Sequence, residues 1–355
     1  MKRTGWIVLA VAMLALIVSP VQAQQYKWRM PTFGSETSTY FVQMAQPFAK
    51  MVKELTDGKV EITVYPAGVL APIFKIHEAV NDGLVEVAHV PPVFLGTKDP
   101  TNAIITQYPG GLGVDALLAW EYYGGGYELL QQHRQEVLKL HSMLVGAGPT
   151  EFFAHSHVPI RKVADLKGLK YRTLGNNAAI VKDFFGASPT VVPFTELYSM
   201  LEKKAIDLLE YSTPSDNLEM GFQEVAKYII YPGIHAPCYA FEVVMKLDRW
   251  NALPKDIQRK LEIAAKAVTM DSLMAVQIRD LQAMQKLEKG RNEWIKLNDE
   301  FQGEFRKAAR KWMWDRAAEE KAKGNLWPEK IAKSYFDFQD YWEKYSKYLY
   351  MSYKP

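Results

Sequence analysis

The stretch LKYRTLGNNAAIVKDFFGASPTVVPFTELYSMLEKKAIDLLEYST, from Leu169 to Thr213, decides the fold because strand and helix patterns alternate along it. Short extended runs of apolar residues are separated by two segments with helical spacing, and glycine or proline marks several of the boundaries. The order strand, helix, strand, helix, strand is typical of a parallel α/β sheet. The stretch therefore predicts one α/β lobe.

The same alternation occurs nearer the start of the chain. The runs YKWRMPTF, KVEITVYPAG and LVEVAHV have strand patterns, and helical patterns lie between them. Single cores stop growing at roughly 250–300 residues, so a chain of 355 residues predicts two lobes. We assign residues 24–146 plus about 235–255 to lobe I, and residues 147–234 plus about 291–325 to lobe II.

Two long helical segments complete the predicted α/β architecture. The first covers about 254–290, begins at Pro254, and at ~1.5 Å per residue reaches ~50 Å, enough to run along both lobes. The run YAFEVVMKL before it is expected to return to lobe I. The second segment, 326–355, predicts a C-terminal helix.

The first 23 residues predict a secretory signal peptide. Lys2 and Arg3 precede an apolar run from Trp6 to Val18, and Val-Gln-Ala precedes a cleavage point after Ala23. The apolar run is shorter than the ~20 residues of a spanning helix. Cleavage would remove two positive charges and lower the net charge from +3 to +1, a balance that does not favour nucleic acid. We therefore predict a periplasmic protein.

The sequence gives little support for catalysis. GLGVDA (111–116) matches a dinucleotide fingerprint, but Pro109 interrupts the segment that enters it. His155 and His157 alternate on an extended run, where one usually points inward and the other outward. No G-x-S-x-G is present, and Cys238 is the sole cysteine. We predict no enzyme and no cofactor required for chemistry.

A carboxylate-binding site is predicted around Arg172. A strand ends at this residue, and the chain turns through Gly175 into a helix that begins near Asn176. The guanidinium would lie beside the positive end of a helix and offer a planar, always-charged fork. The predicted partner is a small organic carboxylate.

Glu210 and Tyr211 end the strand that follows the next helix, so they should face the same crevice as Arg172. A carboxylate beside an anionic ligand needs a counter-charge. Either Glu210 pairs with Arg172, or a cation lies between Glu210 and the ligand. Glu151, on the extended segment that opens lobe II, makes a hard-cation site more plausible.

Motifs along nearly the whole chain resemble the solute-binding subunits of tripartite ATP-independent periplasmic (TRAP) transporters. They are YPAGVL, VNDGLVEVAHV, LKGLKYR, VPFTELYSMLEKKAIDLLEY and YPG, and YPGGLGVDALLAWEYYGGGYELL resembles the branch that binds 2-oxo acids. The resemblance implies a two-lobed, type II-like periplasmic binding protein. It would capture a monocarboxylate such as pyruvate by lobe closure and deliver it to the membrane permease. The alternative ligands are a 2-hydroxy acid such as lactate, a dicarboxylate and a sugar acid. The alternative class of protein is a secreted hydrolase.

By the same resemblance, Arg172 binds the ligand carboxylate and Glu210 binds a cation. Glu151 stands where the branch carries a glutamine shared between ligand and cation, and Tyr211 contributes its carbonyl to the cation. The implied metal ligands are thus Glu151, Glu210 and Tyr211. The extra charge at Glu151 favours Ca²⁺ over Na⁺.

The sequence departs from the family pattern at further ligand-facing positions. Phe94 replaces an expected tyrosine, and Ile234, His235 and Ala236 replace a Trp-Trp-Glu segment. We include Phe94 and His235 among the predicted ligand-binding residues.

The C-terminal segment carries an apolar stripe at helical spacing. Its members are Ile331, Tyr335, Phe338, Trp342, Tyr345 and Leu349. Such a stripe needs an apolar partner. Either the helix folds back onto its own lobe, or it crosses to a second copy of the chain in a homodimer, as in some members of the branch.

Overall fold

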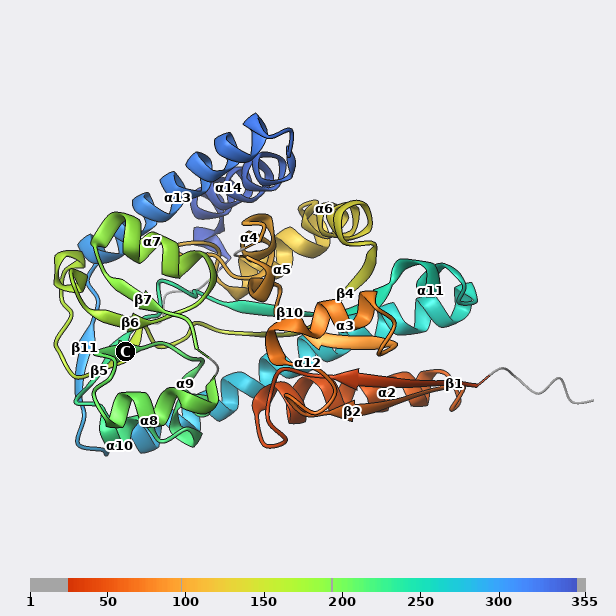
Figure 1. The fold of residues 1–355 in the computed structure, drawn as a ribbon, viewed down its shortest axis with the longest axis horizontal. Helices are drawn as coiled ribbons and strands as arrows, with labels where there is room; N and C mark the ends of the chain where they lie inside the picture. Colours follow the sequence, from red (N-terminus) through yellow and green to blue (C-terminus); the bar gives the residue numbers. More distant parts are fainter. Residues whose placement is uncertain (1–24, 97, 193, 350–355) are drawn as a thin grey trace, which may run out of the picture.

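The computed structural model describes residues 25–349 except positions 97 and 193. The predicted signal peptide, residues 1–23, lies outside the described residues. Two lobes lie side by side, and one long helix runs along both (Figure 1).

The strands of lobe I form two adjoining sheets. β1 (Tyr26–Pro31) pairs in parallel with β2 (Val60–Tyr65), and β10 (Tyr239–Lys246) lies antiparallel between β3 (Val87–Val90) and β4 (Leu140–Gly148). A bridge from Thr32 to His89 joins the two sheets. Because β10 follows lobe II in the sequence, the chain crosses back to lobe I before it enters the long helix.

Short helices connect these strands. They are η1 (Tyr40–Ala45), α2 (Gln46–Leu55), η2 (Ile73–Lys75), α3 (Ile76–Asn81), η3 (Pro92–Leu95), α4 (Thr101–Thr106), α5 (Val114–Tyr123), α6 (Gly126–His133), η4 (Arg134–Leu138) and α11 (Leu247–Asn251). Since η3 directly follows β3, it places Phe94 beyond the carboxyl end of a strand.

Lobe II contains a mixed sheet in the order β11-β9-β5-β8-β6-β7. The strands are β5 (Ala154–Ser156), β6 (Lys170–Arg172), β7 (Ser188–Thr190), β8 (Leu208–Leu209), β9 (Tyr228–Tyr231) and β11 (Glu293–Lys296). β7, β6 and β8 are parallel, as the strand-helix alternation predicts. β5 runs antiparallel to β8 and β9, so the sheet is mixed, although strand-helix alternation is typical of a parallel one.

The helices of lobe II are η5 (Val163–Leu166), α7 (Gly175–Phe185), η6 (Phe194–Glu196), α8 (Leu197–Glu202), α9 (Pro214–Glu219) and α10 (Phe222–Val225). Gly175, the first residue of α7, has φ +55°, and Gly186 after its last turn has φ +68°. Both are left-handed conformations that glycine adopts without strain.

The long helix is α12 (Lys255–Leu287), which follows Pro254. Its 33 residues give a length of about 50 Å. It packs against β4 and α2 of lobe I and against α9 of lobe II. Among the described residues, no helix is both long and apolar enough to cross a bilayer.

After β11 come α13 (Asp299–Ala322), α14 (Trp327–Tyr345) and the short helix η7 (Ser346–Tyr348). α14 packs against α13 and against α4 and α6 of its own chain. Ile331 and Tyr335 of the apolar stripe are fully buried there, and the Tyr335 hydroxyl accepts a hydrogen bond from the Leu112 amide at 2.7 Å. Tyr345 and Leu349, at the far end of the stripe, are exposed. The helix therefore folds back onto its own chain, which is the alternative to the homodimer.

Candidate functional site

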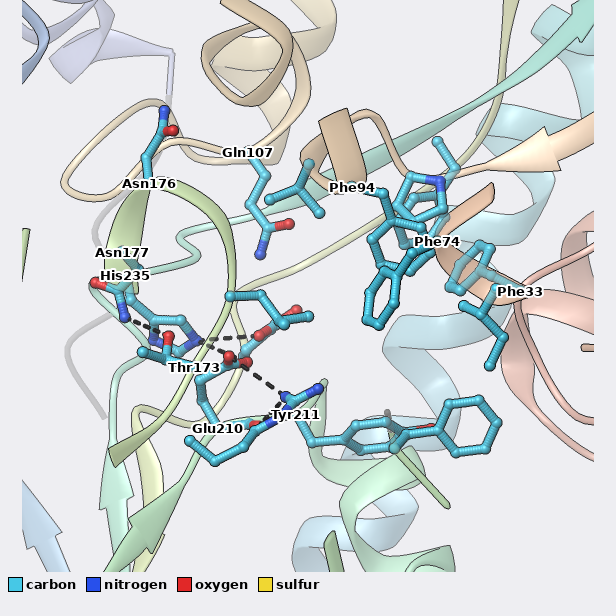
Figure 2. Close-up of a pocket in the computed structure, with 18 of the residues that line it drawn as sticks. Phe33, Phe74, Phe94, Gln107, Thr173, Asn176, Asn177, Glu210, Tyr211 and His235 are labelled. Carbon is cyan, nitrogen blue, oxygen red and sulfur yellow. Dashed lines mark hydrogen bonds and ion pairs between the residues drawn. The ribbon is translucent and has the colours of Figure 1, made fainter. Parts of the chain in front are cut away.

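A pocket lies between the two lobes, and every predicted ligand-binding residue lines it. These are Phe94, Glu151, Arg172, Glu210, Tyr211 and His235. Figure 2 labels four of them, Phe94, Glu210, Tyr211 and His235. The cavity measures about 100 Å³. The structure therefore brings together six side chains from five separate segments of the sequence.

Arg172 reaches this pocket because β6 ends there. Its Nη1 donates to the Glu210 carbonyl at 2.7 Å and lies 3.4 Å from Glu210 Oε1, and its Nη2 donates to the Val192 carbonyl at 3.2 Å. Its Nε is buried and has no protein partner among the described residues. The guanidinium is thus held in place by three contacts while one donor stays unpaired.

Glu210 meets Arg172 because their strands are neighbours. In the parallel pairing of β6 with β8, Arg172 lies opposite Leu209, so Glu210 follows at the same edge of the sheet. Glu210 is 6% exposed and Arg172 is 3% exposed. The contact agrees with the strand-end rule, by which residues at the carboxyl ends of neighbouring parallel strands face the same crevice.

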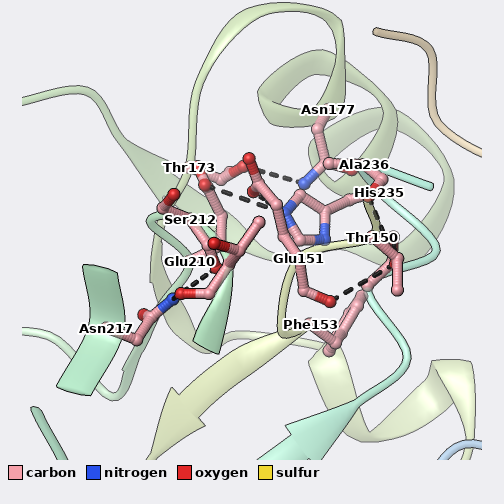
Figure 3. Close-up of polar contacts among 12 residues, drawn as sticks. Thr150, Glu151, Phe153, Thr173, Asn177, Glu210, Ser212, Asn217, His235 and Ala236 are labelled. Atoms are coloured by element: carbon pink, nitrogen blue, oxygen red, sulfur yellow. Dashed lines mark hydrogen bonds and ion pairs between the residues drawn. The ribbon is translucent and has the colours of Figure 1, made fainter. Parts of the chain in front are cut away.

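Glu151 and His235 form a second buried pair, shown in Figure 3. His235 Nε2 donates to Glu151 Oε2 at 3.1 Å and lies 3.7 Å from Glu210 Oε2. The backbone positions this pair, since the Gly233 amide donates to the Glu151 carbonyl at 2.9 Å and the Glu151 amide donates to the Ala236 carbonyl at 3.2 Å. A Cβ at Gly233 would overlap the Glu151 carbonyl, so only glycine allows the two segments to approach this closely.

The burial of these groups shifts their proton affinities. Burial raises the pKa of Glu151 to about 7, although the His235 hydrogen bond opposes the shift. Burial alone would lower the pKa of His235, but hydrogen bonds to Glu151 and Glu210 outweigh it and raise that pKa to about 9. Burial also acts to raise the pKa of Glu210, but the charge of Arg172 and the His235 hydrogen bond lower it. Arg172 and His235 are therefore the positively charged groups of the site, and Glu151 rather than Glu210 is the carboxyl group whose protonated form burial favours.

Sequence reasoning missed several residues of the pocket. Among them are Phe33, Tyr40, Phe74, Gln107, Thr173, Asn177 and Phe241. Phe33 follows β1 as Phe94 follows β3, so the strand-end rule applied to lobe I would have found it. Asn177 lies in the first turn of α7 and donates to Thr173 Oγ1 at 2.7 Å. The predicted start of this helix near Asn176 was the signal that could have identified Asn177.

Residues of the two lobes touch across the pocket. Tyr40 of lobe I contacts Ser212 of lobe II through a hydroxyl–hydroxyl hydrogen bond of 2.5 Å, and Thr39 Oγ1 donates to Asp216 at 2.7 Å. A Cβ at Gly175 would overlap the side chain of Val93. The structure is therefore a closed arrangement of the lobes.

Two α/β lobes closed over a buried, charged pocket define a two-lobed solute-binding protein. The chain belongs to the bacterial extracellular solute-binding proteins of family 7, the DctP family of TRAP transporters, whose family model matches residues 32–321. The family and the two-lobed α/β fold predicted from the sequence are confirmed.

The names of individual relatives state which ligands those proteins bind. The chain is 30% identical over 303 residues to a monocarboxylate 2-oxoacid-binding periplasmic protein of a Nostoc species, and the match covers 82% of each chain. A TRAP solute-binding protein of Pseudoalteromonas atlantica with bound sodium and pyruvate is 28% identical, with a TM-score of 0.83 over 92% of this chain and 97% of that one. One of Colwellia psychrerythraea with bound calcium and pyruvate is 25% identical, with a TM-score of 0.84 and the same coverage.

The pocket residues fit a cation of this kind. One donor atom each of Glu151, Glu210 and His235 lies within 4.8 Å of the others, and all three residues are buried. Two carboxylates are ligands that hard cations prefer. His235 offers a ligand atom that the predicted metal ligands, Glu151, Glu210 and Tyr211, did not include. Since its Nε2 faces both carboxylates, a metal ion entering there would compete with the imidazole proton.

Proposed function

We propose that this protein captures a small monocarboxylate of the 2-oxo acid type and delivers it to the membrane permease of a TRAP transporter. Export through the signal peptide at residues 1–23, with cleavage after Ala23, would place it in the periplasm. A homodimer through the C-terminal helix is not part of this proposal, because two of the six residues of the stripe, Ile331 and Tyr335, are already buried against the same chain.

The observation that carries the proposal is the charge balance of the closed pocket. Arg172 and His235 are cationic, Glu210 is anionic, and Glu151 has a pKa of about 7. When Glu151 holds its proton, one positive charge is left uncompensated, and a monocarboxylate neutralises it. A second carboxylate would bring an unpaired charge into a buried site, which is strongly unfavourable.

Lobe closure supplies the second part of the function. A ligand that contacts both lobes stabilises the closed form over the open one, and the permease can then distinguish loaded from empty protein. The chain offers a direct test, because Gly175 of lobe II abuts Val93 of lobe I in the closed arrangement.

The test compares two substitutions at the ends of α7. Gly175→Ala should weaken pyruvate binding in calorimetry by about tenfold or more, because the new Cβ obstructs closure. Gly186→Ala is the matched control, since it also alters a left-handed glycine but meets only the flexible Lys167 side chain at 3.4 Å. Equal affinity of both variants would contradict the role of closure. If no 2-oxo acid binds the wild-type protein, the proposed function is wrong.

A further inference from the structure

Two neighbouring residues of lobe I are hydrogen-bonded to two residues of lobe II. Thr39 and Tyr40 lie at the start of η1, Ser212 lies between β8 and α9, and Asp216 lies in the first turn of α9. We call these four residues the inter-lobe ring. None of them is more than 6% exposed, so bulk water does not replace these hydrogen bonds while the lobes are closed.

The direction of each hydrogen bond in the inter-lobe ring follows from the carboxylate of Asp216. A carboxylate only accepts, so Ser212 Oγ donates its single proton to Asp216 Oδ2 at 2.9 Å. The Tyr40 hydroxyl therefore donates to Ser212 Oγ, at 2.5 Å. Thr39 donates to Asp216 Oδ1 through its Oγ1 at 2.7 Å and through its amide at 3.3 Å. Asp216 thus collects donors from both lobes.

The charge of Asp216 makes these hydrogen bonds strong. Among the described residues Asp216 forms no ion pair, and its side chain accepts only from Thr39 and Ser212. Hydrogen bonds to an ionised group are roughly twice as strong as those between neutral groups. A hydrogen bond is lost beyond about 3.5 Å, so parting Thr39 Oγ1 from Asp216 by roughly 1 Å breaks this contact. Even a small opening of the lobes therefore costs the carboxylate its donors from lobe I.

Both halves of the inter-lobe ring are fixed within their own lobes. In lobe II, Asn217 Nδ2 donates to the carbonyls of Ser212 and Thr213, and Figure 3 shows Asn217 beside Ser212. In lobe I, the Tyr40 ring packs on Phe33 with centroids 4.6 Å apart. The contacts of the inter-lobe ring therefore report the relative position of the lobes rather than local motion of one side chain.

Three of the four residues lie outside the ligand pocket. Tyr40 lines the pocket, whereas Thr39, Ser212 and Asp216 do not. These three residues can influence a ligand only through Tyr40 or through the position of the lobes.

We propose, building on the function proposed above, that Asp216 is a positioning residue for ligand capture. Through the inter-lobe ring it stabilises the closed lobes, and it thereby sets the affinity for a ligand that it does not touch. Only the closed form makes every contact with the ligand, so stability that the closed form loses is lost from the affinity. Breaking the inter-lobe ring should mainly speed ligand dissociation, because the lobes reopen sooner.

The test removes one hydroxyl of the inter-lobe ring at a time and measures pyruvate binding by calorimetry and by stopped-flow dissociation. Thr39→Val and Ser212→Ala should each weaken the affinity about tenfold, mostly through faster dissociation. Thr39→Ser keeps the hydroxyl that donates to Asp216 and should bind within about twofold of wild type.

Ser38→Ala is the matched control, because Ser38 is also buried and its hydroxyl donates to the Ser35 carbonyl at 2.7 Å within lobe I. It should change pyruvate affinity by less than about twofold. Equal losses of affinity in Thr39→Val and Ser38→Ala overturn the inference, as does wild-type affinity in both Thr39→Val and Ser212→Ala. Either result leaves pyruvate binding, and hence the proposed function, intact.

A measurement without ligand separates this inference from the proposed function. If no 2-oxo acid binds the wild-type protein, the proposed function is wrong, and X-ray scattering of the ligand-free protein then tests the inter-lobe ring alone. Asp216→Ala should have a larger radius of gyration than wild type, because its lobes spend more time apart. Equal radii in that experiment overturn the inference.

Discussion

Replacing Arg172 tests the charged side of the pocket most directly. The guanidinium donates to the carbonyls of Glu210 and Val192 and lies 3.4 Å from Glu210 Oε1. Alanine removes the charge and all three contacts. Lysine keeps the charge, but its single ammonium cannot reproduce the planar fork that reaches two carbonyls and a ligand at once.

The structure predicts two separate losses in Arg172→Ala. Truncating one partner of a buried charge pair costs about 2–5 kcal/mol of binding, which weakens the affinity for the carboxylate roughly 30-fold to several-thousand-fold. The empty protein also loses stability, because Glu210 remains buried without its main counter-charge. Breaking a buried ion pair costs about 3–5 kcal/mol, and since His235 still lies 3.7 Å from Glu210, we expect about 3 kcal/mol.

Calorimetry with a 2-oxo acid and chemical unfolding of the ligand-free protein measure the two losses independently. Lys170→Ala is the matched control, because Lys170 lies on the same strand two residues earlier with an exposed side chain. Arg172→Lys should bind with intermediate affinity and unfold closer to wild type. Binding by Arg172→Ala within about threefold of wild type, or an equal loss in Lys170→Ala, would refute the reasoning.

Two further predictions follow from the buried histidines. His235→Ala removes the positive charge between Glu151 and Glu210. After treatment with EDTA, calcium should therefore raise the unfolding temperature of this variant more than that of wild type, and sodium should be less effective. Equal effects of calcium on the two proteins would count against a cation site. His141 stacks on Trp250 with ring centroids 3.6 Å apart, and burial lowers its pKa to about 3. Its contribution to stability is complete above pH 6.5 and is lost as the pH falls toward 3, by about 2 kcal/mol at pH 5. His141→Phe, which keeps an aromatic ring on Trp250, should therefore move the acid-unfolding midpoint to lower pH; an unchanged midpoint would contradict this.

The sequence predicted the parts of the site that depend on neighbouring strands. Arg172 and Glu210 each end a strand of the same α/β repeat, and parallel neighbours bring such ends together. Phe94 was expected at the pocket from the family resemblance. Its partner Phe33 follows the strand β1, so the rule that ligand-facing residues lie beyond strand ends identifies Phe33 only when it is extended to lobe I.

The contact between Glu151 and His235 depends on long-range backbone pairing, which no local pattern encodes. Glu151 precedes β5, and His235 follows β9, which runs antiparallel to β5. The three-residue strand β5 is too short to show its direction in the sequence, and the strand-helix alternation suggested a parallel sheet. The antiparallel pairing is what brings the start of one segment beside the end of the other.

The C-terminal stripe shows a similar limit. Helical spacing identified the apolar face of α14, including Ile331 and Tyr335, which are buried. Periodicity defines which face of a helix is buried, but it carries no information about which surface covers that face. In this chain α13 and the short helices of lobe I cover it.

The resemblance described in the sequence analysis implies that Glu151 and His235 both replace other residues of the family pattern, and their contact offers one physical reason for both. A second carboxylate beside Glu210 would be strongly unfavourable in a buried site. Donor atoms of Glu151 and Glu210 lie within 4.8 Å of each other, and two carboxyl groups this close cannot both remain ionised without a counter-charge. The imidazole of His235 supplies that counter-charge from within the chain, at 3.1 Å from one carboxylate and 3.7 Å from the other. With both residues present, the imidazole contacts Glu151 and faces Glu210, so none of the three groups is buried without a partner. The two positions should therefore be strongly non-additive in a double-mutant cycle: Glu151→Gln with His235→Ala should lose less stability than the sum of the single losses.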